Sequence, residues 1–349
     1  MNIRIGNICQ TVIHRVGNKN NSEGIYCSES LSDISGIEEM LMQLIKNSFS
    51  FNSSYCFQSI DELTLNPSYV FVSRIFEDND SLINNSKFLA RYLYDCSIHP
   101  NIKNGEFYTL TLKHCFVEDE ETDAIALLKT ETKHSYIYTK EERNAIIPHC
   151  GIGTDLKHLD KGCIIFNLNK SSGYIMFLVD NANRGNDAKY WTESFLHAVP
   201  RSDSYNQTAA VLTLHRKFIA SLDGYNKLEK SEMLQRSVEA LKSENVVLED
   251  VEKAVFPQHD INEHFEAFKK QYIQNTNIKI EDQFTSSSKA IEKQKTALKR
   301  MHTICLDSNV DIIIHNDGSC IERGYDDYVG MNYYKTEVSQ VKIHKRDLT

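Results

Sequence analysis

Five short apolar segments between positions 107 and 179 predict a β-sheet. They are rich in β-branched, aromatic and aliphatic residues. An acidic turn at 118–123 and a polar turn at 169–173 separate neighbouring segments. Strands so short and so closely spaced favour antiparallel pairing. The predicted strands are residues 107–117, 124–129, 135–139, 163–168 and 174–179.

Before these strands the pattern is mixed. Residues 3–16 are either one bent strand or a strand pair, and residues 71–75 are either a short strand or the start of a helix. Apolar residues recur at helical spacing in 37–45, and again in 81–96. The buried face of this second helix is expected to include Phe88, Leu89 and Tyr92.

After the strands, residues 207–300 are mostly helical, and Ile261, Phe265, Phe268 and Tyr272 mark one helical face. The chain then returns to strands. A strand at 311–315 is expected to turn through 316–319, which has Asp-Gly at its centre, and to pair with 321–323. A further strand is expected at 332–337.

This pattern predicts an α+β fold: an antiparallel sheet with flanking helices, followed by a mostly helical region that ends in a C-terminal β-hairpin. The expected domains are residues 1–221, with the sheet, and residues 222–349, with the helices and the hairpin. No long low-complexity linker separates them, so the boundary is soft.

The loop after the last sheet strand is the richest in candidate chemistry. The strand stops at Asp180, and the polar segment up to Asn186 contains Gly185, which suits a positive φ. Asn186 can cap a helix that buries Trp191. Backbone N–H groups beside a helix N-terminus favour phosphate, and the guanidinium of Arg184 suits its oxygens. The alternative is a plain polar turn.

A helix starting at 286–288 is the most basic in the chain. Ala290, Ile291 and Leu298 lie on its apolar side, and Glu292 is the acid among its cations. Such a face either is merely solvated or contacts the phosphate backbone of a nucleic acid. Its basic residues are Lys289, Lys293, Lys295, Lys299 and Arg300.

Charge is the main objection to nucleic-acid binding. The 349 residues carry a net charge of −9, whereas DNA-binding domains are usually basic. Between Lys161 and Ala220, however, seven Lys and Arg residues face four acids, which makes that segment net +3. The sequence therefore predicts a local basic face on an acidic protein.

Nine cysteines without a C-x-x-C pair argue against a disulfide framework or a zinc cluster. The adjacent pairs His114-Cys115 and His149-Cys150 would point their side chains to opposite faces of a strand. Residues 151–153, Gly-Ile-Gly, are interpreted as a turn. No apolar run is long enough to span a membrane and no signal peptide is evident, so we expect a cytoplasmic protein without a cofactor.

Several segments resemble bacterial nucleoid-associated proteins of the NdpA-like group. They are "DAIALLKTE", "LDKGCIIFN", "VDNANRGNDAKYW", "PRSDSYNQT" and "IHNDGSCIERGYDDYVGMNYYK", with a weaker likeness in "IRIGNICQTVIHRVGN". They occur in order over roughly residues 105–340. The resemblance implies association with the nucleoid and binding of double-stranded DNA, and it carries no catalytic residues.

We therefore expect a non-enzymatic protein that binds duplex DNA through its backbone with little sequence specificity, and that forms a homodimer. Little base-specific readout is expected, because nothing in the sequence resembles a groove-reading module. Trp191 is assigned to the core. Arg323 lies in a family-like motif, but it also suits pairing with Asp326 or Asp327. The expected DNA contacts are Asn183, Arg184, Lys189, Arg201, Tyr205, Lys293, Lys299, Arg300 and Arg323.

Two other functions stay open. The acidic surface suits docking of a basic protein partner or mimicry of DNA, in a chromosome-maintenance or phage-defence assembly. Alternatively, Asp123, Glu131 and Lys133 on neighbouring strands would hold Mg²⁺ and orient a water for phosphodiester cleavage.

Overall fold

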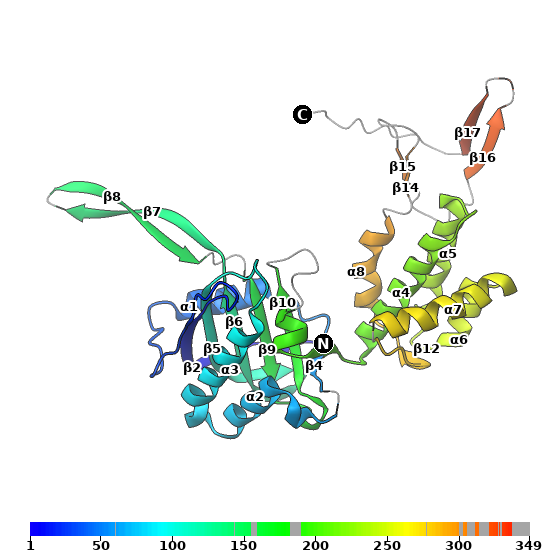
Figure 1. Ribbon diagram of the computed structural model, residues 1–349. Helices are drawn as coiled ribbons and strands as arrows, with labels where there is room; N and C mark the ends of the chain where they lie inside the picture. Colours follow the sequence, from blue (N-terminus) through cyan, green and yellow to red (C-terminus); the bar gives the residue numbers. More distant parts are fainter. Residues whose placement is uncertain are drawn as a thin grey trace. The chain divides into compact units, whose positions relative to one another are not determined.

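The computed structural model describes residues 1–59, 61–142, 144–154, 159–181, 190–276, 278–299, 303–305, 311–313, 321–326, 328 and 330–336. The chain divides into two compact units, Met1–Arg201 and Ser202–Thr349 (Figure 1). The fold is α+β, as the sequence pattern predicts, with an antiparallel sheet in the first unit and mostly helices in the second.

One antiparallel sheet organises the first unit. Its strand order is β11-β4-β10-β9-β6-β5-β2-β3, and β1 also pairs with β5. Four of the five predicted strands lie in it, at β5, β6, β9 and β10. The strands are β1 Ile3–Arg4, β2 Asn7–Val16, β3 Ile25–Tyr26, β4 Tyr55–Phe57, β5 Gly105–Val117, β6 Glu120–Thr130, β9 Lys161–Phe166, β10 Ile175–Asp180 and β11 Ala198–Pro200.

Both faces of this sheet are buried, each in its own apolar core. Along β6, Ile125 and Leu127 pack with helices α2 (Pro67–Glu77) and α3 (Leu82–Cys96). The alternate residues Ala124, Ala126 and Leu128 pack on the opposite face with helix α1 (Glu38–Ser48). Because successive side chains of a strand point to opposite faces, a strand covered on both sides is apolar throughout.

Local contacts correct one predicted helical face. Residues 71–75 form part of helix α2, and α3 buries Leu82, Leu89 and Leu93. Phe88, which was expected in the buried face, is 43% exposed and stacks on Phe71 with ring centroids 5.0 Å apart. The first unit also has short 3₁₀ turns at Leu63–Leu65, Asn79–Ser81 and Lys170–Ser172, and a π-helix at Tyr190–Phe195.

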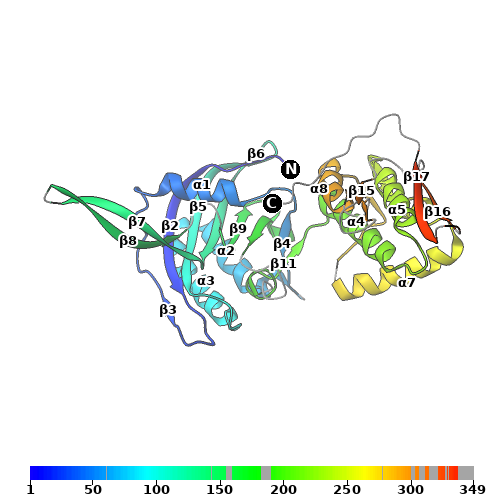
Figure 2. The same ribbon diagram turned by 90° about the horizontal axis from the view of Figure 1, so that it is seen from above.

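A separate hairpin leaves the sheet after β6. Its strands are β7 (Lys133–Glu142) and β8 (Ala145–Thr154), and they pair only with each other among the described strands. Figures 1 and 2 show this ribbon extending away from the sheet. Two predictions are therefore wrong: residues 135–139 do not join the sheet, and Gly151 to Gly153 lie within β8 rather than in a turn.

In the described part of the second unit, five helices and a short strand pair surround one apolar core. Its core includes Phe218, Phe256 and Phe265, whose ring centroids lie 4.6–5.1 Å apart. The elements are α4 Ser204–Ser221, α5 Lys227–Ala240, β12 Asn245–Val247, α6 Leu248–Val255, α7 His259–Thr276, β13 Gln283–Thr285 and α8 Ser288–Lys299.

Helix α4 belongs to this second unit, although the sequence suggested a soft boundary after it. Asp203 caps the helix by accepting a hydrogen bond from the backbone N–H of Asn206 at 2.8 Å. The apolar side of α4, including Val211 and Leu214, lies in the core of the helical unit. Along the chain, the first unit therefore ends at Arg201 and the second begins at Ser202, just before α4.

Two strand pairs end the described chain, so it finishes in a β-hairpin as the sequence predicts. β14 (Thr303–Cys305) pairs with β15 (Asp311–Ile313), and β16 (Ile321–Asp326) pairs with β17 (Met331–Thr336). The expected pairing of 311–315 with 321–323 is wrong, because each of these strands pairs with a different neighbour. Gly330, at φ 72°, closes the β16–β17 turn by donating to the carbonyl of Asp326 at 2.7 Å.

Candidate nucleic-acid interface

A buried polar network lies at one end of the sheet, where strands β6 and β10 end and strand β9 begins. The side chains of Lys129 and Lys161 are completely buried, and their ammonium groups lie 3.1 Å from Glu131 and 2.8 Å from Asp180. The hydroxyl of Tyr190 donates to Glu131 Oε1 at 2.6 Å, and both ammonium groups lie near the Tyr190 ring. The network therefore pairs each buried charge with an opposite charge or a hydroxyl group.

Asp160 fixes the path of the chain beside this network. One of its carboxylate oxygens accepts hydrogen bonds from the backbone N–H groups of Glu131 and Thr132, at 2.7 and 2.9 Å. The other accepts from the Thr132 hydroxyl at 2.7 Å. The Asp160 carbonyl accepts from the N–H of Asn181 at 2.8 Å. One residue thus ties the end of β6 to the end of β10.

Burial shifts the protonation equilibria of this network. It lowers the pKa of Lys129, against the opposing attraction of Glu131. It raises the pKa of Asp180, against the hydrogen bond from Lys161, and it raises the pKa of Tyr190 well above its usual value. Desolvation disfavours the charged form of each group, so the ion pairs must offset a large free-energy cost of removing these charges from water.

The network occupies three of the family-like segments, those containing Lys129, Lys161 and Asp180. Sequence reasoning missed it, apart from the nuclease interpretation of Glu131. The available signal was the placement of Lys and Asp at the ends of otherwise apolar strands, where a buried charge needs a partner. The network holds the end of β10 at Asp180. Asn183, Arg184 and Lys189 follow shortly after this strand end in the sequence.

Trp191 is a core residue, as expected. It is fully buried in the π-helix, packs on Phe195 with ring centroids 5.0 Å apart, and donates its indole N–H to the Gly162 carbonyl at 3.4 Å. A ring enclosed in this way offers no face to a nucleic-acid base, so it is not a stacking platform.

The three proposed nuclease residues do not meet. Asp123 lies near the start of β6 and its carboxylate pairs with Lys113 at 2.5 Å, whereas Glu131 follows the end of that strand. Eight residues of extended strand separate two such groups by about 26 Å. Lys133 is bonded to Glu106. The metal-dependent nuclease interpretation is therefore contradicted for these residues.

The expected basic face over residues 161–220 is not formed by the described cations. Lys161 is buried against Asp180, and Lys170 pairs with Glu77 at 2.5 Å. Lys217 lies in the other unit, with its ammonium group 4.9 Å from the Tyr272 ring centroid. The net positive charge of this segment does not form a single basic surface. Some of its cations are buried or paired with carboxylates, and others belong to a different unit.

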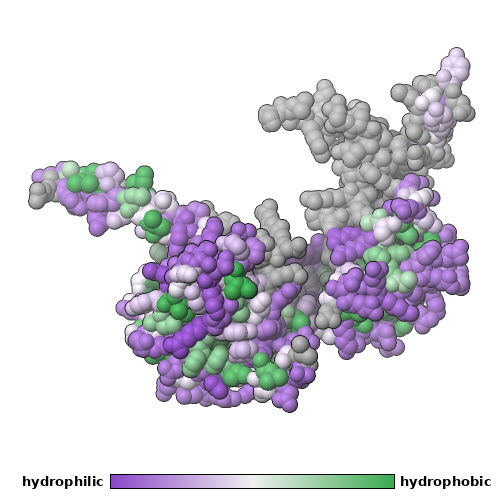
Figure 3. All heavy atoms as spheres, viewed as in Figure 1, coloured by the Kyte–Doolittle hydropathy of each residue, from purple (hydrophilic) through white to green (hydrophobic). Residues whose placement is uncertain are grey.

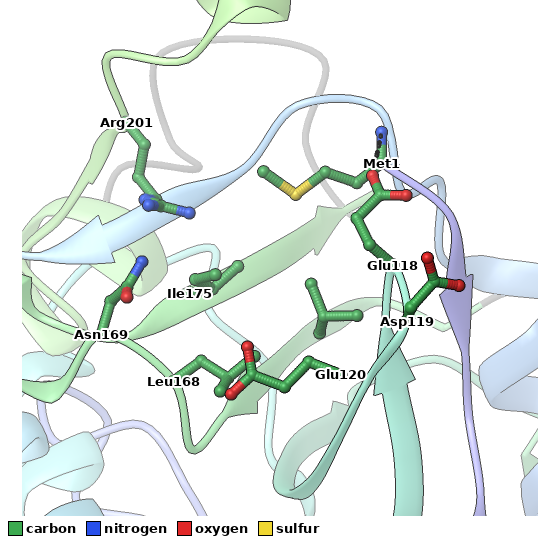
Figure 4. A pocket seen from close by; sticks show the side chains of 9 residues that line it. Met1, Glu118, Asp119, Glu120, Leu168, Asn169, Ile175 and Arg201 are labelled. Carbon is green, nitrogen blue, oxygen red and sulfur yellow. Dashed lines mark ion pairs between the residues drawn. The ribbon is translucent and has the colours of Figure 1, made fainter.

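Arg201 lines a hollow of about 760 Å³ in the first unit. Figure 4 shows Arg201 and Asn169 across the hollow from Glu118 and Asp119, and Glu120 also lines it. Three carboxylates beside one guanidinium disfavour a polyanion. Tyr205 is half-buried in the first turn of α4, so the two expected contacts belong to different units.

Helix α8 is amphipathic, as the sequence predicts. Ala290 and Ile291 are buried, whereas Lys289 and Lys293 are exposed. Within the described part of the chain, neither lysine makes an ion pair with a carboxylate. These cations therefore stay available to an anionic partner, in contrast to Lys242, Lys253 and Lys269, which pair with glutamates.

The N-terminal end of α8 is less suited to phosphate than its basic side. A hollow of about 290 Å³ there is lined by Lys242, Glu244 and Glu292 among other residues. Lys242 is already paired with Glu239 at 2.5 Å. Two carboxylates therefore oppose the favourable end of the helix dipole.

Several expected contacts lie outside the described residues. Asn183, Arg184, Lys189 and Arg300 are among them. Lys299 ends α8, and Arg323 stands opposite Tyr334 in the β16–β17 pair, but the structure describes only the backbone of these two residues. The structure therefore does not test their contacts.

The described units define a two-part α+β protein in which His, Cys, Asp and Glu side chains form no cluster suited to a metal ion within the described ranges. A family model for nucleoid-associated protein YejK matches residues 12–326, and the chain belongs to that family. No curated protein matched the chain. None of the described helices is long and apolar enough to cross a bilayer.

Proposed function

We propose that this chain binds double-stranded DNA, mainly through the phosphate backbone and with little sequence specificity. Membership of a nucleoid-associated family supports an association with DNA. The observation that carries the binding mode is the pair of exposed lysines on α8, Lys289 and Lys293, which no described carboxylate neutralises. Lysine is a flexible point charge that suits phosphate oxygens rather than the edges of particular bases.

The sequence adds Lys295, Lys299 and Arg300 to the same helical segment. It also provides a second candidate contact at Asn183, Arg184 and Lys189, next to the strand end that the buried network holds. Arg201, Tyr205 and Arg323 remain part of the proposed interface on the strength of the family-like motifs alone. The acidic surroundings of Arg201 make it the weakest of these contacts.

The surrounding charge limits the strength of this interaction. At a net charge of −9, the protein as a whole repels DNA, and only locally unpaired cations favour binding. We therefore expect a modest affinity that depends on a small number of phosphate contacts. Nucleoid association then follows from the abundance of DNA sites rather than from recognition of one sequence.

Paired charge-removing variants test this interface. Lys289→Gln with Lys293→Gln should weaken binding to a random-sequence duplex by about tenfold, because two phosphate contacts are lost. Lys253→Gln with Lys270→Gln is the matched control: it removes the same charge from α6 and α7, and should change affinity only slightly. Fluorescence anisotropy with labelled duplex measures both.

A second variant in the same assay, Arg184→Gln with Lys189→Gln, tests the contact after β10. Circular dichroism must show that every variant is folded. Equal affinities for wild type and the α8 variant would remove that helix from the interface. Equal losses in the α8 variant and its matched control would show that overall charge, not this surface, governs binding.

A further inference from the structure

The β7–β8 hairpin has two faces that differ in chemistry. Residues paired directly across antiparallel strands point to the same face. Ile137 pairs with Cys150, and Ser135 with Ile152. Two more pairs on this side are Thr139 with Pro148 and Glu141 with Ile146, and Lys133 pairs with Thr154 nearest the sheet. We call this side the aliphatic face; it consists of Lys133, Ser135, Ile137, Thr139, Glu141, Ile146, Pro148, Cys150, Ile152 and Thr154.

The opposite face carries aromatic side chains that pack on one another and on the strand backbone. The Tyr136 ring lies across Gly151 and Gly153, so closely that a Cβ added at Gly151 would come within 2.6 Å of it. Tyr138 stacks on His149 with ring centroids 5.5 Å apart, and the Lys140 ammonium lies 5.7 Å from the Tyr138 centroid. The glycines thus leave room for the Tyr136 ring, which packs along the ribbon while staying 51% exposed.

The aliphatic face has no such ring packing and is more exposed. Ile137, Ile146 and Ile152 are 78%, 70% and 73% exposed, and Pro148 and Cys150 between them are exposed too. Figure 3 shows hydrophobic residues spaced along this ribbon. Isolated two-stranded ribbons are marginally stable in water, and grouped exposed apolar residues mark interaction surfaces. We propose that the aliphatic face is a dimerisation surface whose partner is the same face of a second copy of this chain.

The order of the charged residues along the aliphatic face indicates that its partner is a second copy of the chain. Lys133 lies at the end next to the sheet, Glu141 lies near the tip, and the Ile137–Cys150 pair stands midway between them. Two copies stacked antiparallel place each Lys133, whose ammonium group also contacts Glu106 of its own chain, opposite the partner's Glu141, with the isoleucines between. A two-fold axis crosses at the central pair, as a self-complementary interface requires. Parallel stacking leaves both charges without an opposite charge on the partner.

DNA is a poorer occupant of this face. Glu141 is an anion that repels phosphate, and Lys133 is the single cation of this face. The isoleucines offer nothing to phosphate or to the polar edges of bases. An apolar surface with balanced end charges therefore fits a copy of itself better than it fits a polyanion.

The size of the ribbon sets the expected strength of the dimer. Ten-residue strands extend about 33 Å. Such a narrow face buries on the order of 1,200 Å² over both copies, at the lower limit for specific interfaces. We therefore expect a weak dimer that dissociates on dilution, with a dissociation constant of roughly 1–100 µM.

Sedimentation equilibrium of the full chain over that concentration range tests the proposal. Ile137→Thr with Ile152→Thr keeps β-branched residues in the strands but removes four isoleucines from the dimer, and should weaken it at least about tenfold. Ile147→Thr, on the opposite face, is the matched control and should associate like the wild type. Circular dichroism verifies that all three proteins are folded.

A bis-maleimide cross-linker tests the geometry independently. Stacking about the central pair brings Cys150 close to the partner's Cys150, so a short linker should join two wild-type chains. Cross-linking should be lost in Cys150→Ser and kept in Cys9→Ser, which removes another exposed thiol. A monomeric wild type at all concentrations, or a dimer unaffected by the paired threonine substitutions, would overturn the proposal. A double variant that stays as dimeric as wild type but loses DNA affinity would also overturn it, in favour of DNA as the occupant.

Discussion

His215 illustrates how one buried side chain couples stability to pH. It lies in α4 against the rings of Phe256 and Phe265, and its Nδ1 is 2.7 Å from the Ser237 hydroxyl. Burial, assisted by the positive charge of Lys269, lowers the pKa of His215 to about 3. The folded protein therefore keeps this imidazole neutral at pH values where an exposed histidine is charged.

This shift predicts acid sensitivity of the helical unit. Below pH 6.5 the unfolded chain binds a proton at His215 that the folded chain does not, so the free energy of unfolding falls as pH falls toward 3. At pH 4.5 the loss is about 3 kcal/mol relative to pH 7. Urea denaturation at both pH values should show a smaller difference for His215→Gln than for the wild type. An unchanged pH dependence in the variant would contradict this assignment.

Residue-scale sequence reasoning succeeded where burial alone decides the outcome. A single tryptophan spaced with Phe195 on one face is most simply a core residue, and Trp191 is one. It failed where a residue's partner comes from elsewhere in the chain. Phe88 has an apolar ring at a helical position, yet it stacks on Phe71 at the surface because the inward positions belong to Leu89 and its neighbours.

At the scale of elements, Lys161 and Asp180 join β9 to β10. They stand directly opposite each other in the strand register, and their side chains form the 2.8 Å ion pair. Removing one member of a buried pair leaves the other charge without compensation, which costs more than removing both. A single substitution in this pair is therefore expected to lower the free energy of unfolding by more than the pair itself contributes to it.

Lys161→Met should lower the free energy of unfolding by about 3 kcal/mol, because Asp180 is left in a mostly buried position. Lys161→Met with Asp180→Leu should recover at least about 1 kcal/mol of this loss. Urea denaturation of the three proteins measures the difference. A double variant less stable than the single one would show that the charges stabilise the fold in themselves.

The elements also show why the third predicted strand was misplaced. Residues 135–139 have strand composition, but composition does not say which strand is the neighbour. In β8 the glycines that resemble a turn are strand residues, because they pair with Tyr136 and His134 of β7, and the Tyr136 ring lies over them. The relevant signal was alternation: Gly151 and Gly153 on one face with Ile152 between them on the other.

The whole molecule is acidic, so any interaction with DNA must come from a few local cations. If Lys289, Lys293, Arg184 and Lys189 each neutralise one phosphate, the logarithm of the binding constant should fall with the logarithm of salt concentration with a slope of about −3.6. Anisotropy titrations between about 50 and 200 mM salt measure this slope. A slope near zero would exclude backbone contacts, and one twice as steep would require a larger basic surface than these residues provide.

The sequence by itself determined the fold class, most of the helices and the family, because periodic burial and short motifs are written locally along the chain. Only the tertiary structure decided which charges are available. Lys161 and Lys170 count as cations in the sequence, but folding pairs each with a carboxylate, whereas it leaves Lys289 and Lys293 exposed. Tertiary structure also placed Ile137, Ile146 and Ile152 of the hairpin on one exposed face, because the side that a strand residue takes depends on its register with a neighbour.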